Sequence, residues 1–297
     1  MILYLFAFIF TLIYLYQSRI HPLKNPGKII YILVRKITKI RIQMKNLINR
    51  LLKPFNAEIH GKGYLQALAN GDFNKDAFKI QQNLLQDSDV VTIFDLGANR
   101  GDTVQIYLEL FPKCIVHAFE PFPGSFEMLA QRFAGNKRVI LNMSAIASEE
   151  KTAQMFVNYN VDTNSLLKPM VTGLSSDKSA KNINSIDITT ITIEQYCIKN
   201  KIEKIDILKM DIQGGEYAAL QGGVNLINEK KIRLIYTESY FIRQYEKQPL
   251  FYEIAGFLNE KHYNLQDIYT PIYGHGSLAW CDAIFLPRNN DCLDKLR

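Results

Sequence analysis

Residues 92–102 read Thr-Ile-Phe-Asp-Leu-Gly-Ala-Asn-Arg-Gly-Asp, an apolar strand that runs into a carboxylate and then into two glycines spaced four apart. Val90 to Phe94 has the composition of a buried parallel strand, Gly97 allows a sharp turn, and Gly101 lets the next helix begin close to a ligand. A dinucleotide site instead has three glycines, G-x-G-x-x-G, that hold a pyrophosphate. With Asp95 facing the loop, the spacing favours a cationic nucleotide cofactor, and S-adenosylmethionine is such a ligand.

A second short strand supports the same kind of site. Ile115 to Phe119 is apolar and ends on Glu120-Pro121, nineteen residues after Gly101. A carboxylate about twenty residues beyond the glycine loop is where an α/β nucleotide site accepts the two ribose hydroxyls. Glu120 is therefore the predicted ribose ligand; the alternative is that Asp95 and Glu120 are only polar strand ends.

Several motifs in order resemble one known family. The run Asp95-Leu-Gly-Ala-Asn-Arg-Gly-Asp-Thr103, then His117-Ala-Phe-Glu-Pro121, then Ile205-Asp-Ile-Leu-Lys-Met-Asp-Ile-Gln-Gly-Gly-Glu216, resembles the FkbM family of S-adenosylmethionine-dependent methyltransferases. The resemblance spans roughly residues 90 to 287, and Leu278 to Phe285 is similar to that family's last strand. It implies a Rossmann-like class I methyltransferase fold and O-methylation of a hydroxyl, often on a sugar, glycan or polyketide. Gln213 is a departure, because many members carry a glutamate there.

The resemblance also bears on the adenine side of the cofactor. In members, the segment after the third strand lies near the cofactor ring, and here that segment is Asn142-Met-Ser144-Ala. Asn142 or Ser144 is expected to hydrogen-bond the ring, with a structural role as the alternative. The expected cofactor-binding residues are Asp95, Gly97, Asn99, Gly101, Glu120, Asn142 and Ser144.

From residue 90 onward the pattern alternates strand and helix, which predicts an α/β domain over 90–288 with a doubly wound, seven-stranded, mostly parallel sheet. Strands are expected near 90–95, 115–120, 138–142, 204–211, 232–238, 264–269 and 279–286. Helices are expected over 101–111, 124–134, 192–200, 215–227 and 249–261. The polar segment Val171 to Asn184 interrupts this rhythm and indicates a lid, a substrate-side insertion or disorder.

The predicted strand ending at Asp211 carries the candidate catalytic residues, because ligands lie beyond the carboxyl ends of strands in an open α/β sheet. Lys209 and Asp211 share one face, so Asp211 is the expected partner of the lysine. Asp211 is the first candidate for the base that takes the hydroxyl proton, and Glu238 is the second. Glu216 either caps the following helix or faces substrate.

Other polar residues are weaker candidates. His275, in a loop before the last strand, is third in line as a base, and His117 is discounted because it lies inside a strand. The four cysteines show no C-x-x-C spacing and no His/Cys cluster, so they are expected to be reduced and structural, with no dedicated metal site.

The N-terminal sixty residues predict a membrane attachment. Residues 1–17 carry no charged side chain through Tyr16 and indicate an uncleaved anchor helix, with a cleaved signal or a peripheral helix as alternatives. Residues 18–60 contain a helical apolar seam with basic side chains away from it, which favours an amphipathic helix on anionic lipid or a helix packed on protein. Residues 61–89 are expected to be a helical preamble.

The charge of the chain is unevenly distributed. Ten Lys and Arg residues and no acid lie between residues 17 and 54, which leaves 25 basic against 29 acidic residues elsewhere. The catalytic domain is therefore mildly acidic and is not expected to bind nucleic acid. Because the basic excess follows the apolar segment, the positive-inside rule predicts a membrane-anchored protein with a cytoplasmic catalytic domain.

Three other functions are consistent with parts of this pattern. An NAD-dependent oxidoreductase of Rossmann type also has a glycine loop after a strand and a carboxylate for the ribose, but this chain lacks the third glycine of that pattern. A nucleic-acid N-methyltransferase is expected to carry an Asn/Asp-Pro-Pro-aromatic turn, where this chain has Asp211-Ile-Gln-Gly-Gly215. A membrane-tethered cofactor-binding module without catalysis is the third. The expected acceptor is a small molecule or a glycan, either lipid-linked or soluble.

Overall fold

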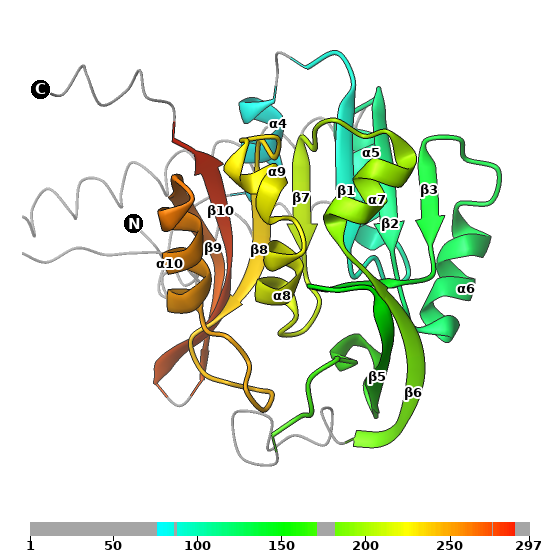
Figure 1. Cartoon of the computed structure of the whole chain (residues 1–297), viewed down its shortest axis with the longest axis vertical. Helices are drawn as coiled ribbons and strands as arrows, with labels where there is room; N and C mark the ends of the chain where they lie inside the picture. Colours follow the sequence, from blue (N-terminus) through cyan, green and yellow to red (C-terminus); the bar gives the residue numbers. More distant parts are fainter. Residues whose placement is uncertain (1–75, 86–87, 171–181, 275, 289–297) are drawn as a thin grey trace, which may run out of the picture. The chain divides into compact units, whose positions relative to one another are not determined.

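The computed structural model describes residues 76–85, 88–170, 182–274 and 276–288, all within the second of two compact units, Ala67–Arg297. In this described part, seven strands form one sheet in the order β3-β2-β1-β7-β8-β10-β9 (Figure 1). β10 pairs antiparallel with both of its neighbours, and the other pairings are parallel. The predicted doubly wound, mostly parallel sheet is confirmed. Its strands are β1 (Val91–Leu96), β2 (Cys114–Phe119), β3 (Val139–Asn142), β7 (Ile207–Met210), β8 (Ile235–Tyr240), β9 (Tyr263–Gly274) and β10 (Ser277–Pro287).

Helices cover both faces of this sheet, because its central strands are apolar on both sides. Ile93 of β1 faces a core with Val104, whereas Phe94 faces a second core with Tyr196. The first core packs against α4 (Ala77–Leu84), α5 (Asp102–Leu110) and α6 (Pro123–Arg132). The second packs against α7 (Ile193–Asn200), α8 (Glu216–Gln221), α9 (Val224–Asn228) and α10 (Phe251–Glu260). This two-sided burial fixes which side chains of each strand reach the site.

One predicted helix is wrong in its extent. The segment expected as a single helix over 215–227 is two short helices, α8 and α9, separated by Gly222 and Gly223. A Cβ on Gly222 would lie 2.2 Å from the backbone oxygen of Ala147. The chain therefore breaks where close backbone contact requires glycine, a constraint that helical periodicity does not reveal.

A second, smaller sheet was not predicted. β4 (Ala145–Ile146), β5 (Lys151–Asn158) and β6 (Asn182–Ile191) pair in the order β4-β6-β5, with the 3₁₀ helix η2 (Val161–Thr163) after β5. β5 and β6 lie beyond the carboxyl ends of the main parallel strands (Figure 1). The last residues of the polar segment Val171 to Asn184, predicted as a lid, a substrate-side insertion or disorder, belong to β6, because Asn184 pairs with Val157 of β5.

Several predictions fall outside the described residues: the anchor over 1–17, the helix over 18–60, His275, Cys292 and most of the polar segment 171–184. Of the preamble, the structure describes α4. No helix in the described residues is long and apolar enough to cross a bilayer. Cys114, Cys197 and Cys281 are buried free thiols, as expected.

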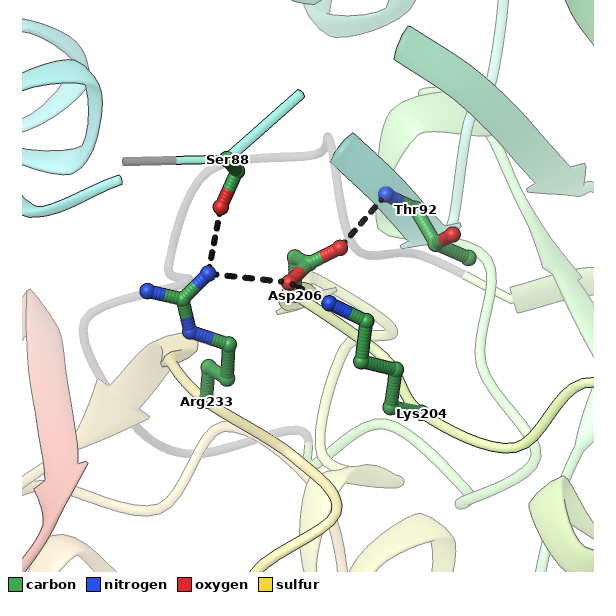
Figure 2. A network of polar contacts seen from close by, with 5 residues as sticks. All are labelled: Ser88, Thr92, Lys204, Asp206 and Arg233. Atoms are coloured by element: carbon green, nitrogen blue, oxygen red, sulfur yellow. Dashed lines mark hydrogen bonds and ion pairs between the residues drawn. The ribbon is translucent and has the colours of Figure 1, made fainter. Parts of the chain in front are cut away.

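A polar network ties the elements together at the amino ends of β1 and β7, opposite the carboxyl ends. Asp206 is fully buried, and its Oδ2 accepts a hydrogen bond from the Thr92 amide at 2.9 Å (Figure 2). Its Oδ1 lies 3.2 Å from Arg233 and 3.4 Å from Lys204, and Arg233 also contacts Ser88. This network fixes the start of two central strands and leaves their carboxyl ends for ligands.

Candidate cofactor and acceptor site

A cavity of about 310 Å³ opens at the carboxyl ends of β1, β2 and β7, with part of the small sheet over it. Six of the predicted site residues line this cavity: Gly97, Asn99, Glu120, Ser144, Lys209 and Asp211. The described residues that line it do not include Asp95, Gly101, Asn142 or Glu238. Met155 of β5, Val161 of η2 and Ser165 contribute the side formed by the small sheet and the segment after it.

The two glycines of the loop are required by packing. Gly97 has a φ of +80°, and a Cβ there would lie 2.0 Å from the backbone oxygen of Asp211. Gly101 has a φ of +85°, and its Cβ would lie 2.3 Å from the Phe133 ring. The first glycine thus lets β1 turn tightly against the end of β7, and the second lets α5 begin against α6.

Glu120 lies where a ribose ligand is expected. Its Oε2 accepts a hydrogen bond from the Asn99 amide at 2.9 Å, and its Oε1 accepts one from the Phe122 amide at 2.9 Å. Burial raises the pKa of this carboxyl, and the two backbone donors oppose that rise. Both oxygens are held in place by the loops of β1 and β2, so the side chain is oriented before any ligand binds.

The predicted pairing of Lys209 with Asp211 is wrong. Lys209 Nζ lies 2.9 Å from Asp95 Oδ1 and donates to the backbone oxygen of Gly97 at 3.2 Å. Asp95 and Lys209 are direct cross-strand partners on β1 and β7, and strands lie about 4.8 Å apart, whereas residues i and i+2 on one strand are separated by about 6.6 Å. The shorter distance selects Asp95, which is fully buried.

This pair changes what each group offers a ligand. Burial raises the pKa of Asp95, and the neighbouring ammonium opposes the rise. The Lys209 pKa is raised despite its burial, because Asp95 and Asp211 are both close by. Asp95 therefore holds Lys209 beneath the glycine turn, and of Asp95 and Asp211 it is Asp211 that lines the cavity.

Gln213 connects the two candidate bases. Its Nε2 donates to Asp211 Oδ1 at 3.0 Å and to Glu238 Oε2 at 3.0 Å. Its Oε1 is 2.8 Å from the Tyr245 hydroxyl and 3.2 Å from that of Tyr240. Gln213 lines the cavity and Glu238 does not, and burial together with the Asp211 charge raises the Glu238 pKa well above its usual value.

Glu216 supports the turn after β7. It is 1% exposed, and its Oε1 accepts hydrogen bonds from the amides of Ile212 at 3.0 Å and Gly214 at 3.2 Å. Burial raises its pKa to about 7. Of the two alternatives for this residue, the structure supports the backbone-capping one.

Asn142 and His117 are held by their own elements. Asn142 Nδ2 lies 3.2 Å from the oxygen of Ile140 and 3.4 Å from that of Ala118, so the amide is directed at the strands. His117 Nδ1 lies 2.8 Å from the Tyr196 hydroxyl, and burial lowers the histidine pKa to about 4. Ser144 is buried and lines the cavity, so of the two residues predicted for the adenine side it is the one that reaches the cavity.

Sequence reasoning missed several residues of this site. Asp162 of η2 accepts from Asn99 Nδ2 at 2.8 Å and lies 3.5 Å from Arg100, which links the small sheet to the glycine loop. Tyr240 donates to Glu238 at 2.6 Å, and its position two residues after Glu238 on one strand was a usable signal. Tyr245 had none, since it reaches Gln213 from the loop after β8.

Comparison with known proteins adds the family context. The methyltransferase FkbM domain matches residues 95–265, more than half of the chain. Over 172 residues the chain is 27% identical to the 2-O-methyltransferase NoeI of Sinorhizobium fredii, covering 56% of this chain and 70% of that protein.

Two solved structures are similar at lower identity. One is TrmK of M. capricolum in complex with S-adenosylhomocysteine, at 12% identity and a TM-score of 0.39, covering 72% of this chain and 69% of that one. The other is an rRNA methylase from Streptococcus thermophilus, at 10% identity and a TM-score of 0.39, covering 72% of this chain and 98% of that one.

Proposed function

Because the chain belongs to the FkbM methyltransferase family and is therefore an S-adenosylmethionine-dependent methyltransferase, we propose that it methylates a hydroxyl oxygen. Asp211 carries this proposal. It is a partly buried carboxylate on the cavity wall, and its Oδ1 is oriented by Gln213. A hydroxyl loses its proton as its oxygen takes a methyl group, and a carboxylate in reach can accept that proton. The oxidoreductase alternative has no support from the family match.

The residues around the cavity fit S-adenosylmethionine. Glu120 offers a carboxylate already oriented for two vicinal hydroxyls, and Ser144 offers a hydroxyl on the adenine side. Phe119 and Ile146 supply apolar wall for a purine ring. When bound, the cofactor supplies an electrophilic methyl group on a sulfonium. We assign Glu120 to the ribose and Ser144 to the adenine. We assign Gly97 and Asn99 to the loop that encloses the rest of the cofactor.

The chain's own contribution to the reaction is position and proton transfer. Holding the hydroxyl oxygen about 3 Å from the methyl carbon supplies much of the acceleration of an in-line displacement. We assign to Asp211, which lines the cavity, the orientation of that hydroxyl and the acceptance of its proton. Lys209, held between Asp95 and the Gly97 oxygen, is a support under the same turn. In this proposal its catalytic role is electrostatic, because its positive charge acts on the neighbouring Asp211 carboxylate.

We propose a sugar, glycan or polyketide-like hydroxyl as the acceptor. Support comes from the 2-O-methyltransferase relative and from Asp211, whose carboxylate lines the cavity. A carboxylate is suited to orienting a hydroxyl group of an acceptor.

The test uses the full-length protein. Calorimetry is expected to show binding of S-adenosylmethionine and S-adenosylhomocysteine in preference to NAD. Incubation of glycan and lipid fractions with cofactor labelled in its methyl group is expected to give a base-stable methyl ether. Labelling of a nitrogen or carbon atom, or NAD binding without adenosylmethionine binding, contradicts the proposal. Asp211→Asn is expected to keep cofactor affinity while lowering turnover about 10²-fold or more.

A further inference from the structure

Asp162 of η2 connects the small sheet with the glycine loop on the other side of the cavity. Its Oδ1 accepts a hydrogen bond from Asn99 Nδ2 at 2.8 Å and lies 3.5 Å from Arg100 Nη2. A carboxylate only accepts hydrogen bonds, so the nitrogen of the Asn99 side chain is the atom that faces it. Asp162 and Asn99 both line the cavity. The contact therefore joins two sides of the cavity wall.

Asn99 is also the residue that orients Glu120. Its backbone amide donates to Glu120 Oε2 at 2.9 Å. Its φ of +46° lies in the left-handed region, which is uncommon for a non-glycine residue and persists where surrounding contacts determine it. The direction of the amide that holds Glu120 thus depends on the contacts that keep Asn99 in this conformation. The hydrogen bond to Asp162 is one of them.

The 3₁₀ helix η2 gives Asp162 a defined position. The side chain of Asn160 caps the start of this helix, because its Oδ1 accepts from the Asp162 amide at 3.2 Å. At the end of the helix, the backbone oxygen of Thr163 lies 3.0 Å from the Tyr245 hydroxyl. Tyr245 belongs to the loop after β8 and is buried. η2 is therefore tied to a part of the main domain outside the glycine loop.

We propose that Asp162 is a positioning residue of the cofactor site, which holds Asn99 so that its amide keeps Glu120 oriented toward the ribose before the cofactor binds. This inference rests on the assignment of Glu120 to the ribose under the proposed function. A loop that is ordered in advance loses less conformational freedom on binding, so the ligand binds more tightly.

The same geometry separates affinity from stability. The side chains of Asp162 and Arg100 are both about half exposed, and ion pairs between such groups add little to folding stability. Loss of Asp162 is therefore expected to weaken cofactor binding while the fold stays intact.

The test is calorimetry on the full-length protein with two ligands. S-adenosylhomocysteine carries the amino-acid part of the cofactor, whereas methylthioadenosine keeps the adenine and the ribose but lacks that part. Asp162→Ala is expected to weaken the binding of both by a similar factor, about three- to tenfold, because the effect reaches the ligand through Glu120 and the ribose. The melting temperature without ligand is expected to fall by no more than about 3 °C.

Two further variants identify the cause of that loss. Asp162→Asn removes the negative charge but keeps an oxygen that accepts from Asn99 Nδ2, so it is expected to restore binding of both ligands close to the wild-type affinity. Asp187→Ala removes an exposed acid of the same small sheet, on β6, and is the control that is expected to bind as wild type.

Four results overturn the proposal, and they are distinguishable. A loss in Asp162→Ala that is confined to S-adenosylhomocysteine makes Asp162 a direct ligand of the amino-acid part. An equal loss in Asp162→Asn and Asp162→Ala makes the charge the cause. Wild-type affinity in Asp162→Ala, beside weakened binding in Glu120→Gln, leaves Glu120 at the ribose and removes only the positioning role. Wild-type affinity in Glu120→Gln removes the ribose assignment as well.

Discussion

At the scale of single residues, distance decides which charges act together. Lys209 shares a face with Asp211 along its own strand, yet it pairs with Asp95 across the sheet, because the cross-strand separation is the shorter one. The charge of Asp95 is thereby balanced by Lys209 under the glycine turn. Asp211 instead accepts a hydrogen bond from Gln213 and lines the cavity. The chemistry of the site follows from this division.

The first prediction concerns Glu120. Glu120→Gln is expected to weaken S-adenosylhomocysteine binding at least tenfold, because charge-assisted hydrogen bonds to hydroxyls contribute about 1.5 to 3 kcal/mol each. Calorimetry measures the affinity. The exposed Glu127→Gln on α6 is the matched control and is expected to bind as wild type. An unchanged affinity in Glu120→Gln removes this residue from the ribose.

The second prediction concerns Glu216 and pH. Its folded-state pKa is about 7, above the usual 4.5, so the folded protein binds an extra proton between these values. The free energy of unfolding therefore falls as pH rises from about 4.5 to about 7. Glu216→Gln keeps an oxygen for both backbone donors and does not titrate.

Denaturant unfolding at pH 5 and pH 8 measures this effect. The loss of stability between the two pH values is expected to be smaller in Glu216→Gln than in wild type, by up to about 3 kcal/mol. Glu260→Gln, on the exposed end of α10, is the control. Equal pH dependence in wild type and Glu216→Gln contradicts the prediction.

At the scale of elements, turns and helix starts depend on positions where a side chain does not fit. The glycine loop is a packing requirement of β1, β7, α5 and α6 before it is a ligand site, since the atoms that exclude a Cβ belong to the protein. The glycine pair between α8 and α9 has the same cause at Gly222.

The third prediction separates collision from backbone strain. Gly135 has a φ of +76°, and a Cβ there would have no atom within 4 Å. Gly135→Ala is therefore expected to lower the free energy of unfolding by about 1 to 2 kcal/mol through backbone strain alone. Gly97 has a similar φ, and a Cβ there would lie 2.0 Å from a backbone oxygen. Gly97→Ala is expected to lower the free energy of unfolding by at least about 2 kcal/mol more than Gly135→Ala does. Chemical denaturation of both variants measures the difference, and equal losses contradict the packing role.

At the scale of the whole molecule, the two ends of the sheet have separate tasks. The carboxyl ends of the central strands carry the cavity, whereas the amino ends carry the buried Asp206 network of Figure 2. Among the described residues, the carboxyl ends hold residues with strained backbone and polar groups without a hydrogen-bond partner. At the amino ends, both carboxylate oxygens of Asp206 have partners. Stability and function are therefore separable by mutation.

The fourth prediction tests this separation. Asp206→Asn is expected to lower the free energy of unfolding by about 2 to 3 kcal/mol, less than a fully buried pair, because Arg233 is 31% exposed. Cofactor affinity is expected to stay unchanged. Lys204→Ala, at a side chain 58% exposed, is the control and is expected to cost under about 1 kcal/mol. A loss of affinity in Asp206→Asn that survives correction for unfolded protein contradicts the separation.

The sequence by itself determined the alternation of strands and helices, the glycine turn, the family and the candidate carboxylates. Apolar runs, helical periodicity and glycine spacing are local properties, so all seven strands were located, although β9 extends five residues past its predicted end at residue 269, to Gly274. The membrane anchor and the cytoplasmic orientation stay predictions of the same kind, since they rest on charge and hydropathy of residues outside the described ranges.

Only the tertiary structure decided which polar groups meet. The partner of Lys209, the convergence of Tyr240 and Tyr245 on Gln213, and the small sheet beside the cavity all join residues far apart in the chain. Such contacts depend on strand register and on which face each side chain takes after folding. A one-residue change of register moves a side chain to the other face of the sheet. The local sequence pattern therefore does not predict these long-range contacts.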